Sequence, residues 1–330
     1  MRFYSFPFKI IGMLAGIKLL KAKNFLGRHQ SVSKLNLRPG EIVEVKDENE
    51  IVSTLDEHGS YEGLAFTSEM RKYCGKRFKV LRRVNKLLVE SIPGGLRRIK
   101  DAVILEGVVC TGEAHGGCGK ACPFLWKEAW LKRVNSKSEA SLKPFNNNSA
   151  YDFAGKLLSC QEISLINATS LLGVLDFRHY LWEISSEASH GMDYLKKAVE
   201  WLKFRITLHM RPGKFTVKGK RKTTPVEVLG LRPGEIVEVK SREEILETLD
   251  FKGRNRGLQF MPEMFKYCGK RFRVLKRVDR MVVAASGKMR SIPNTVILEG
   301  VYCDGKAHGG CQRMCSCLWR EIWLRRVNDA

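Results

Sequence analysis

Short runs in which apolar and polar residues alternate recur along the chain and predict β-strands rather than long helices. Within the first 134 residues, strands are expected at 42–45, 77–84 and 103–106, and short helices at 48–55 and 68–73. Proline and glycine residues separate these runs and provide tight turns. This pattern predicts a mainly β fold with added α elements, built on a small SH3-like antiparallel β-barrel.

The same pattern occurs a second time later in the chain. The shared motifs are LRPGEIVEVK at 37–46 and 231–240, YCGKRF at 73–78 and 267–272, and AHGGC at 114–118 and 307–311. The sequence therefore predicts a tandem duplication. We expect a lead-in over 1–36, a first repeat over 37–134, a linker and helical spacer over 135–230, and a second repeat over 231–330. The helical pattern of the spacer covers 151–209.

The segment before the first repeat has apolar residues at helical spacing. Ile10, Met13 and Ile17 would share one face of an amphipathic N-terminal helix. Such a helix would dock on a neighbouring domain or make peripheral contact with an anionic membrane surface. Lys9 and Lys18 interrupt the apolar stretch, so we expect neither a transmembrane span nor a secretory signal. A cytoplasmic location follows from this.

A helix is also predicted at the end of each repeat, over 120–130 and 313–323. Apolar residues recur there at three-to-four spacing, namely Leu125, Trp126, Ala129 and Trp130, then Leu318, Trp319, Ile322 and Trp323. The tryptophans would pack in a core, or they would form a stacking platform for nucleic acid or a peptide anchor. Core packing is the commoner role at this spacing.

Four cysteines occur at matching positions in each copy. They are Cys74, Cys110, Cys118 and Cys122 in the first, and Cys268, Cys303, Cys311 and Cys315 in the second. In a reducing compartment, clustered cysteines are more often metal ligands than disulfides. We therefore predict two structural zinc sites per chain, each with four thiolate ligands. Iron–sulfur clusters, disulfides and unliganded thiols remain as alternatives.

Two histidines and two further cysteines lie close to this set. His115 and His308 each precede a predicted ligand cysteine by three residues, and would either bind the metal or donate hydrogen bonds to thiolates. Cys160 and Cys317 have no match in the other copy and are interpreted as buried apolar thiols. We find no arrangement of residues that predicts catalysis, so the enzyme class is disfavoured.

The chain is strongly basic, with 58 Lys and Arg residues against 35 Asp and Glu and a formal charge of +23. Such a charge favours nucleic acid or another polyanion as a partner. The basic residues expected to contact phosphates are Lys76, Arg77, Arg82, Arg83, Lys270, Arg271, Arg273, Lys276 and Arg277.

The ordered set of motifs resembles a known cassette. PGEIVEV, YCGKRFxV, VILEG and HGGCxxxC followed by W-x-x-x-W are similar to motifs of a group of uncharacterised bacterial proteins that usually carry them once. The resemblance covers both repeats but brings no activity with it. At the level of fold alone, the entry strand and the CGKRF strand also resemble SH3-like barrels such as the β-subunit of nitrile hydratase.

Three hypotheses about function follow. The first is a non-enzymatic protein with two structural zinc sites that presents basic surfaces to a polyanion, most simply nucleic acid. The second is a scaffold or accessory subunit of a biosynthetic enzyme, which would have a protein partner. The third is a redox protein that carries two iron–sulfur clusters.

Overall fold

The computed structural model describes residues 34–89, 96–134, 160–172, 217–283 and 286–327. All of them belong to one compact unit, residues 34–330. The predicted N-terminal helix lies outside the described residues, as does most of the helical spacer. Within the described part of the chain, no helix is long and apolar enough to cross a membrane.

The first repeat consists of β-strands, one α-helix and three 3₁₀ helices. In chain order its elements are β1 (Ile42–Val45), α1 (Glu48–Val52), β2 (Ser60–Tyr61), β3 (Leu64–Ala65), η1 (Ser68–Tyr73), β4 (Arg77–Leu88), β5 (Leu96–Val109), η2 (Glu113–His115), β6 (Pro123–Lys127), η3 (Glu128–Trp130) and β7 (Leu131–Arg133). The central segment adds α2 (Gln161–Ser164) and β8 (Ser170–Leu171). The strands and short helices expected from the sequence pattern are present.

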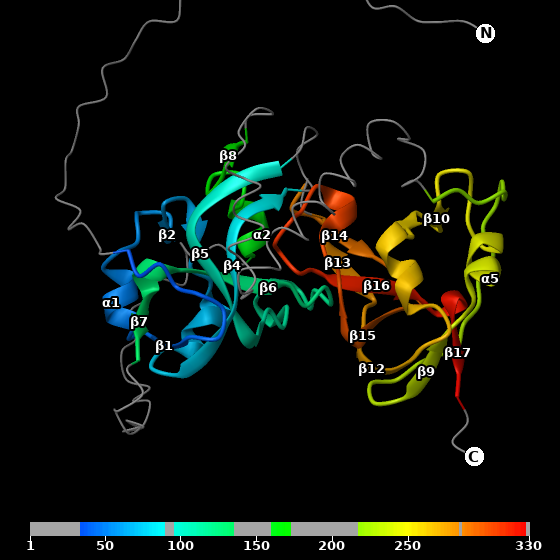
Figure 1. Ribbon diagram of the computed structural model, residues 1–330, viewed down its shortest axis with the longest axis horizontal. Helices are drawn as coiled ribbons and strands as arrows, with labels where there is room; N and C mark the ends of the chain where they lie inside the picture. The colour runs from blue at the N-terminus through cyan, green and yellow to red at the C-terminus, as the bar shows by residue number, and fades with distance from the viewer. Residues whose placement is uncertain (1–33, 90–95, 135–159, 173–216, 284–285, 328–330) are drawn as a thin grey trace, which may run out of the picture. The chain divides into compact units, whose positions relative to one another are not determined.

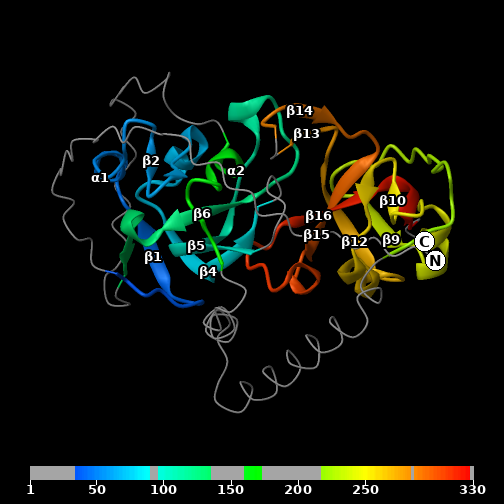
Figure 2. The same cartoon turned by 90° about the horizontal axis from the view of Figure 1, so that it is seen from above.

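The second repeat follows the same order of elements, with one exception. Its elements are β9 (Ile236–Val239), α5 (Arg242–Glu247), β10 (Arg254–Asn255), β11 (Leu258–Gln259), η5 (Pro262–Tyr267), β12 (Arg271–Arg277), β13 (Arg280–Val282), β14 (Met289–Ser291), β15 (Thr295–Tyr302), η6 (Lys306–His308), β16 (Ser316–Arg320), η7 (Glu321–Trp323) and β17 (Leu324–Arg326). The exception is that four strands, β12 to β15, stand where the first repeat has β4 and β5. The strands of the two repeats form two separate groups, blue to green and yellow to red (Figures 1 and 2).

The main sheets are antiparallel and have corresponding strand orders. The first runs β6-β5-β4-β1-β7, with β8 added beside β5, and the second runs β16-β15-β12-β9-β17. β4 is long enough to serve two partners, since its start pairs with β1 and the rest pairs with β5. The fold is therefore mainly β, with antiparallel sheets and a half-barrel.

The predicted helix at the end of each repeat is wrong. Residues 123–127 form strand β6, which pairs with β5, and only one 3₁₀ turn separates it from β7. All five residues of β6 are buried, and a short, fully buried strand has no alternation that distinguishes it from a buried helix. Trp126 lies on β6 and Trp130 ends the 3₁₀ turn, so their four-residue spacing does not come from an α-helix. Both are fully buried, which confirms core packing.

A buried carboxylate holds the chain segment that leads into each repeat. Glu128 is 2% exposed and accepts hydrogen bonds from the amides of Asn36 and Leu37, while Arg83 forms an ion pair with it. Glu321 occupies the equivalent position in the second repeat and pairs with Arg277. Two of the basic residues that the sequence suggested for phosphate contact therefore hold the chain entry in place.

The central segment 160–172 packs against the first repeat. Gln161 is buried and bonds to the backbone of Ala65 and Leu125, and the amide of Ala65 donates to Oγ of Ser164. β8 extends the sheet beside β5. In both views, α2 lies with the strands of the first repeat (Figures 1 and 2).

The two repeats contact each other through equivalent groups. The amide of Gly119 donates to the carbonyl of Arg280 at 2.9 Å, and the amide of Gln312 donates to the carbonyl of Lys86 at 3.1 Å. Gly119 aligns with Gln312, and Lys86 aligns with Arg280. A Cβ on Gly119 would lie 2.9 Å from Cγ1 of Val278, so glycine permits this close approach. In each repeat, the loop that follows the AHGGC motif thus contacts the other repeat. It lies against β13 in one case and β4 in the other.

Candidate metal centres

A buried carboxylate, a thiol and an imidazole meet in the first repeat. The donor atoms of Glu69, Cys110 and His115 all lie within 4.8 Å of one another. Glu69 comes from η1, Cys110 follows β5, and His115 ends η2. Glu69 accepts hydrogen bonds from the amides of Thr111 and Ala114, so it holds the loop that carries the histidine. Three elements distant in sequence therefore build the group.

The distances in this group suit a shared cation. Sγ of Cys110 lies 3.7 Å from Nε2 of His115. A thiolate and an imidazole bound to one tetrahedral zinc would be about 3.5 Å apart, given the usual Zn–S and Zn–N bond lengths. Nδ1 of His115 is buried without a hydrogen-bond partner among the described residues, and lies 3.8 Å from Oε1 of Glu69. A small closure would let it donate to this carboxylate, as metal-bound histidines commonly do.

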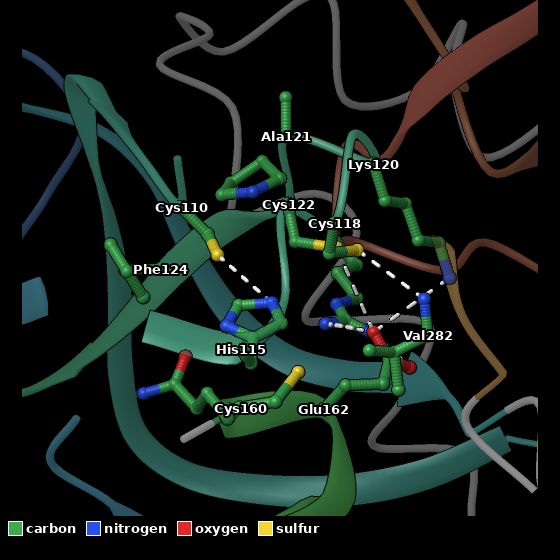
Figure 3. Close-up of a pocket in the computed structure, with 13 residues that line it drawn as sticks. Cys110, His115, Cys118, Lys120, Ala121, Cys122, Phe124, Cys160, Glu162 and Val282 are labelled. Atoms are coloured by element: carbon green, nitrogen blue, oxygen red, sulfur yellow. Dashed lines mark hydrogen bonds and ion pairs between the residues drawn. The ribbon is translucent and has the colours of Figure 1, made fainter. Parts of the chain in front are cut away.

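Further thiols surround the imidazole. Figure 3 shows the His115 ring among the side chains of Cys110, Cys118 and Cys160, which line one cavity. Hydrogen bonds with these three thiols raise the pKa of His115. Burial alone would raise the pKa of Cys118, but hydrogen bonds from His115 and from the amide of Val282 lower it. The site therefore favours a thiolate at Cys118.

The second repeat contains the equivalent group. The donor atoms of Glu263, Cys303 and His308 also lie within 4.8 Å of one another. Oε1 of Glu263 is 3.3 Å from Sγ of Cys303 and 3.3 Å from Nε2 of His308. Here the carboxylate itself faces both other donors. Cys317 lies nearby, because Glu263 is among the charges that act on its thiol.

The structure does not gather the four predicted cysteines of either copy around one point. Among the described residues, no group of three or more close metal-binding donors contains two cysteines, and none contains Cys74 or Cys268. These two thiols end η1 and η5 on the side of α1 and α5. Burial and then Glu48 raise the pKa of Cys74 to about 12. Cys74 thus lies near acidic residues and outside the donor group that contains His115.

Cys122 and Cys315 belong to a third environment, at the contact between the repeats. Arg313 forms a buried ion pair with Glu162, with Nη2 and Oε2 2.6 Å apart and both side chains 3% exposed. The charges of this pair and of Lys120 act electrostatically on both thiols. Burial alone would raise the pKa of Glu162, but Arg313 and then Lys120 lower it to about 2.

The sequence did not predict the roles of Glu69, Glu263 and Cys160 in the candidate centres. Glu69 and Glu263 precede Met70 and Met264 at matching positions, and this repeated Glu-Met pair was a signal that would have identified them. Cys160 gave no such signal, because it lies outside both repeats. Its place beside His115 follows from the packing of α2 on the first repeat. His115 lies beside Cys110, and His308 lies beside Glu263.

Most of the basic residues predicted for phosphate contact have partners inside their own repeat. Ion pairs with carboxylates join Arg77 to Glu44, Arg83 to Glu128, Arg271 to Glu238, Arg273 to Glu299 and Arg277 to Glu321. Nζ of Lys276 donates to the carbonyl of Thr111 across the repeat contact. Arg82 also has an interaction partner, while Lys76 and Lys270 are exposed.

Comparisons with protein-family models, with curated proteins and with solved structures find no match for this chain.

Proposed function

We propose that this chain is a metal-binding protein with two structural centres, one in each repeat, and that zinc is the metal. The observation that carries the proposal is the recurrence of one Glu, one Cys and one His at equivalent positions, with donor atoms close together in both copies. Imidazole and thiolate together suit zinc, whereas an iron–sulfur cluster requires more convergent thiolates than either group holds. A reducing cytoplasm would keep these thiols free for the metal.

In the first repeat, we assign His115, Cys110, Cys118 and Cys160 as the ligands. Only Cys110 lies in a close donor group with His115, so Cys118 and Cys160 would have to move toward this pair on metal binding to complete the four donors of a closed structural site. Glu69 would orient the imidazole from its other nitrogen. Because Cys160 comes from the central segment, the metal would fasten that segment to the repeat. This role replaces the interpretation of Cys160 as an inert thiol.

In the second repeat, Glu263, Cys303 and His308 would bind directly, and a nearby thiol would complete the site. Cys317 is the candidate on symmetry grounds. It is the one cysteine of this repeat without a match in the other copy, just as Cys160 lies outside the first repeat. Each centre would therefore use one cysteine that the repeat pattern alone does not reveal.

The metal would stabilise the fold of each repeat by linking elements that are separate in sequence. It would join the end of β5 to the loop that follows, next to η1, whose Glu69 already accepts hydrogen bonds from that loop. Structural zinc sites contribute on the order of 10 kcal/mol of apparent free energy to small domains. We further propose that the two main sheets belong to duplicated SH3-like barrels, because their strand orders correspond. Each barrel would be closed by the metal centre of its own repeat.

The test is the metal content of the purified protein and of paired variants. We expect two zinc ions per chain in the wild type. The double variant Cys110→Ser/His115→Ala should retain one zinc, and so should Cys303→Ser/His308→Ala. The matched control is Cys74→Ser/Cys268→Ser, which removes two repeated cysteines outside the groups and should retain both ions. Cobalt substitution would report thiolate ligands through charge-transfer absorption.

Three other results would contradict the proposal. Loss of zinc from Cys74→Ser/Cys268→Ser would support the two four-thiolate sites predicted from the sequence. It would contradict the ligands that we assign here. Brown protein containing iron and sulfide would favour the iron–sulfur hypothesis. A wild-type chain that binds neither zinc nor iron under anaerobic conditions would contradict metal binding altogether.

A further inference from the structure

The two repeats differ in charge at one pair of equivalent positions. In the first repeat, Nζ of the buried Lys127 lies 2.7 Å from Oε2 of Glu62, and the two form an ion pair. The sequence repeat aligns Lys127 with Arg320 and Glu62 with Arg256. The second repeat therefore keeps the buried cation and replaces its carboxylate partner with a second cation.

Within the described residues, Arg320 has only neutral hydrogen-bond partners. Its Nε donates to the carbonyl of Asn255 at 3.4 Å, its Nη1 to the carbonyl of Pro293 at 2.6 Å and to Oγ1 of Thr295 at 3.0 Å, and its Nη2 to the carbonyl of Arg256 at 2.9 Å. The residue is 6% exposed. These bonds fix the guanidinium in place but leave its positive charge without a counterion.

Arg290 brings a third guanidinium to the same place. Its Nη2 is 3.3 Å from the position that a Cβ on Gly257 would occupy, next to Arg256 in sequence. Burial, then Arg256 and Arg290, lower the pKa of Arg320 to about 10. Arg256 and Arg290 are exposed, and none of the three arginines pairs with a carboxylate in the described part of the chain.

Arg256 and Arg320 line a small, open cavity that encloses about 10 Å³. Two carboxylates, Glu227 and Glu321, also line it, but each already forms an ion pair with a basic side chain of its own. The positive charge of Arg256 and Arg320 is therefore not compensated from within the cavity.

In the first repeat, the third arginine is already engaged by another segment. The equivalent of Arg290 is Arg97, which donates to Oγ1 of Thr169 at 2.6 Å and to the carbonyl of Ile166 at 3.2 Å. The guanidinium of Arg97 is thus engaged in hydrogen bonds with segment 160–172. Among the described residues, the second repeat has no covering segment at the equivalent place.

We propose that Arg256, Arg290 and Arg320 form a binding site for a phosphate group, in the second repeat and not in the first. Guanidinium groups bind phosphate through paired charge-assisted hydrogen bonds. Arg320 supplies a fixed charge at the base, and the exposed Arg256 and Arg290 contact the phosphate oxygens. The phosphate belongs either to a free polyphosphate or to a nucleic-acid backbone. The site is separate from both metal centres and does not depend on them.

The test compares two variants that carry the same charge change on one hairpin. Arg256→Glu recreates the ion pair of the first repeat, and Glu62 already tolerates the left-handed backbone at that position, with φ of 49° against 46° for Arg256. Arg254→Glu is the matched control, since Arg254 is exposed on β10 and lies outside the cavity. Binding of labelled short single-stranded RNA and of tripolyphosphate would be measured separately, with zinc content and melting temperature recorded.

We expect Arg256→Glu to lower affinity about tenfold and to reduce the salt dependence of binding, while Arg254→Glu changes affinity about twofold. Binding of tripolyphosphate that depends on Arg256 would assign the site to free phosphates. RNA binding that depends on Arg256, without tripolyphosphate binding, would assign it to a nucleic-acid backbone. Equal losses in both variants, or no binding of either ligand by a folded wild type, would overturn the proposal.

Discussion

The backbone amide of Val282 donates a hydrogen bond to Sγ of Cys118 at 3.4 Å, so a thiol of the first repeat is bonded to the backbone of the second. At the equivalent place, the amide of Leu88 donates to Sγ of Cys311 at 3.3 Å. Cys118 is also one of the thiols around His115. The same sulfur atom therefore belongs to a candidate metal centre and to the contact between the repeats.

The first prediction concerns this shared atom. Cys118→Ala removes the acceptor of the Val282 amide, and one such hydrogen bond contributes about 1 kcal/mol net. Amide hydrogen exchange at Val282 should therefore accelerate about fivefold in metal-free protein, where loss of a ligand plays no part. Exchange measured by NMR at single residues would show this.

Cys311→Ala is the reciprocal control for that prediction. It should accelerate exchange at Leu88 and leave Val282 close to its wild-type rate, because the two bonds lie at separate equivalent positions. Unchanged exchange at Val282 in Cys118→Ala would show that this contact does not protect the amide.

The sequence predicted the strands and short helices well because their signals are local. Turn residues bound residues 42–45 and 77–84, and alternation identifies the face of each strand. The ends of the repeats were predicted wrongly for a physical reason. Strand β6 is buried on both faces, so its apolar run carries no period, and the four-residue spacing of Trp126 and Trp130 does not come from an α-helix.

The candidate centres were predictable only in part. Matching positions in the two copies pointed to Cys110 and His115, which the structure brings together. Repetition also pointed to Cys74, but a residue that is kept in both copies can serve packing beside α1 as well as a metal. Cys160 depends on how a segment outside the repeats folds back, which no local pattern encodes.

The second prediction separates the two tryptophans of the first repeat. The indole nitrogen of Trp130 donates to Oγ1 of Thr54 at 3.2 Å, whereas that of Trp126 is buried without a partner among the described residues. Trp130→Phe should therefore cost about 1 kcal/mol more than Trp126→Phe in free energy of unfolding, measured by urea denaturation. Either residue changed to alanine should cost about 3–5 kcal/mol. Equal costs for the two phenylalanine variants would contradict a role for the Thr54 bond.

The third prediction concerns the buried ion pair between Glu162 and Arg313, which joins the central segment to the second repeat. Glu162→Gln leaves the guanidinium of Arg313 without its carboxylate, and breaking a buried pair from one side costs about 3–5 kcal/mol. The double variant Glu162→Gln/Arg313→Met removes both charges and should recover part of that loss, because no unpaired ion remains. Urea denaturation of the two single variants and the double variant would give the coupling energy. The exposed pair of Lys132 and Glu50 is the control, where Glu50→Gln should cost at most about 1 kcal/mol. Additive losses at positions 162 and 313 would mean that the two side chains do not form this pair in solution, and that the central segment is attached by its other contacts alone.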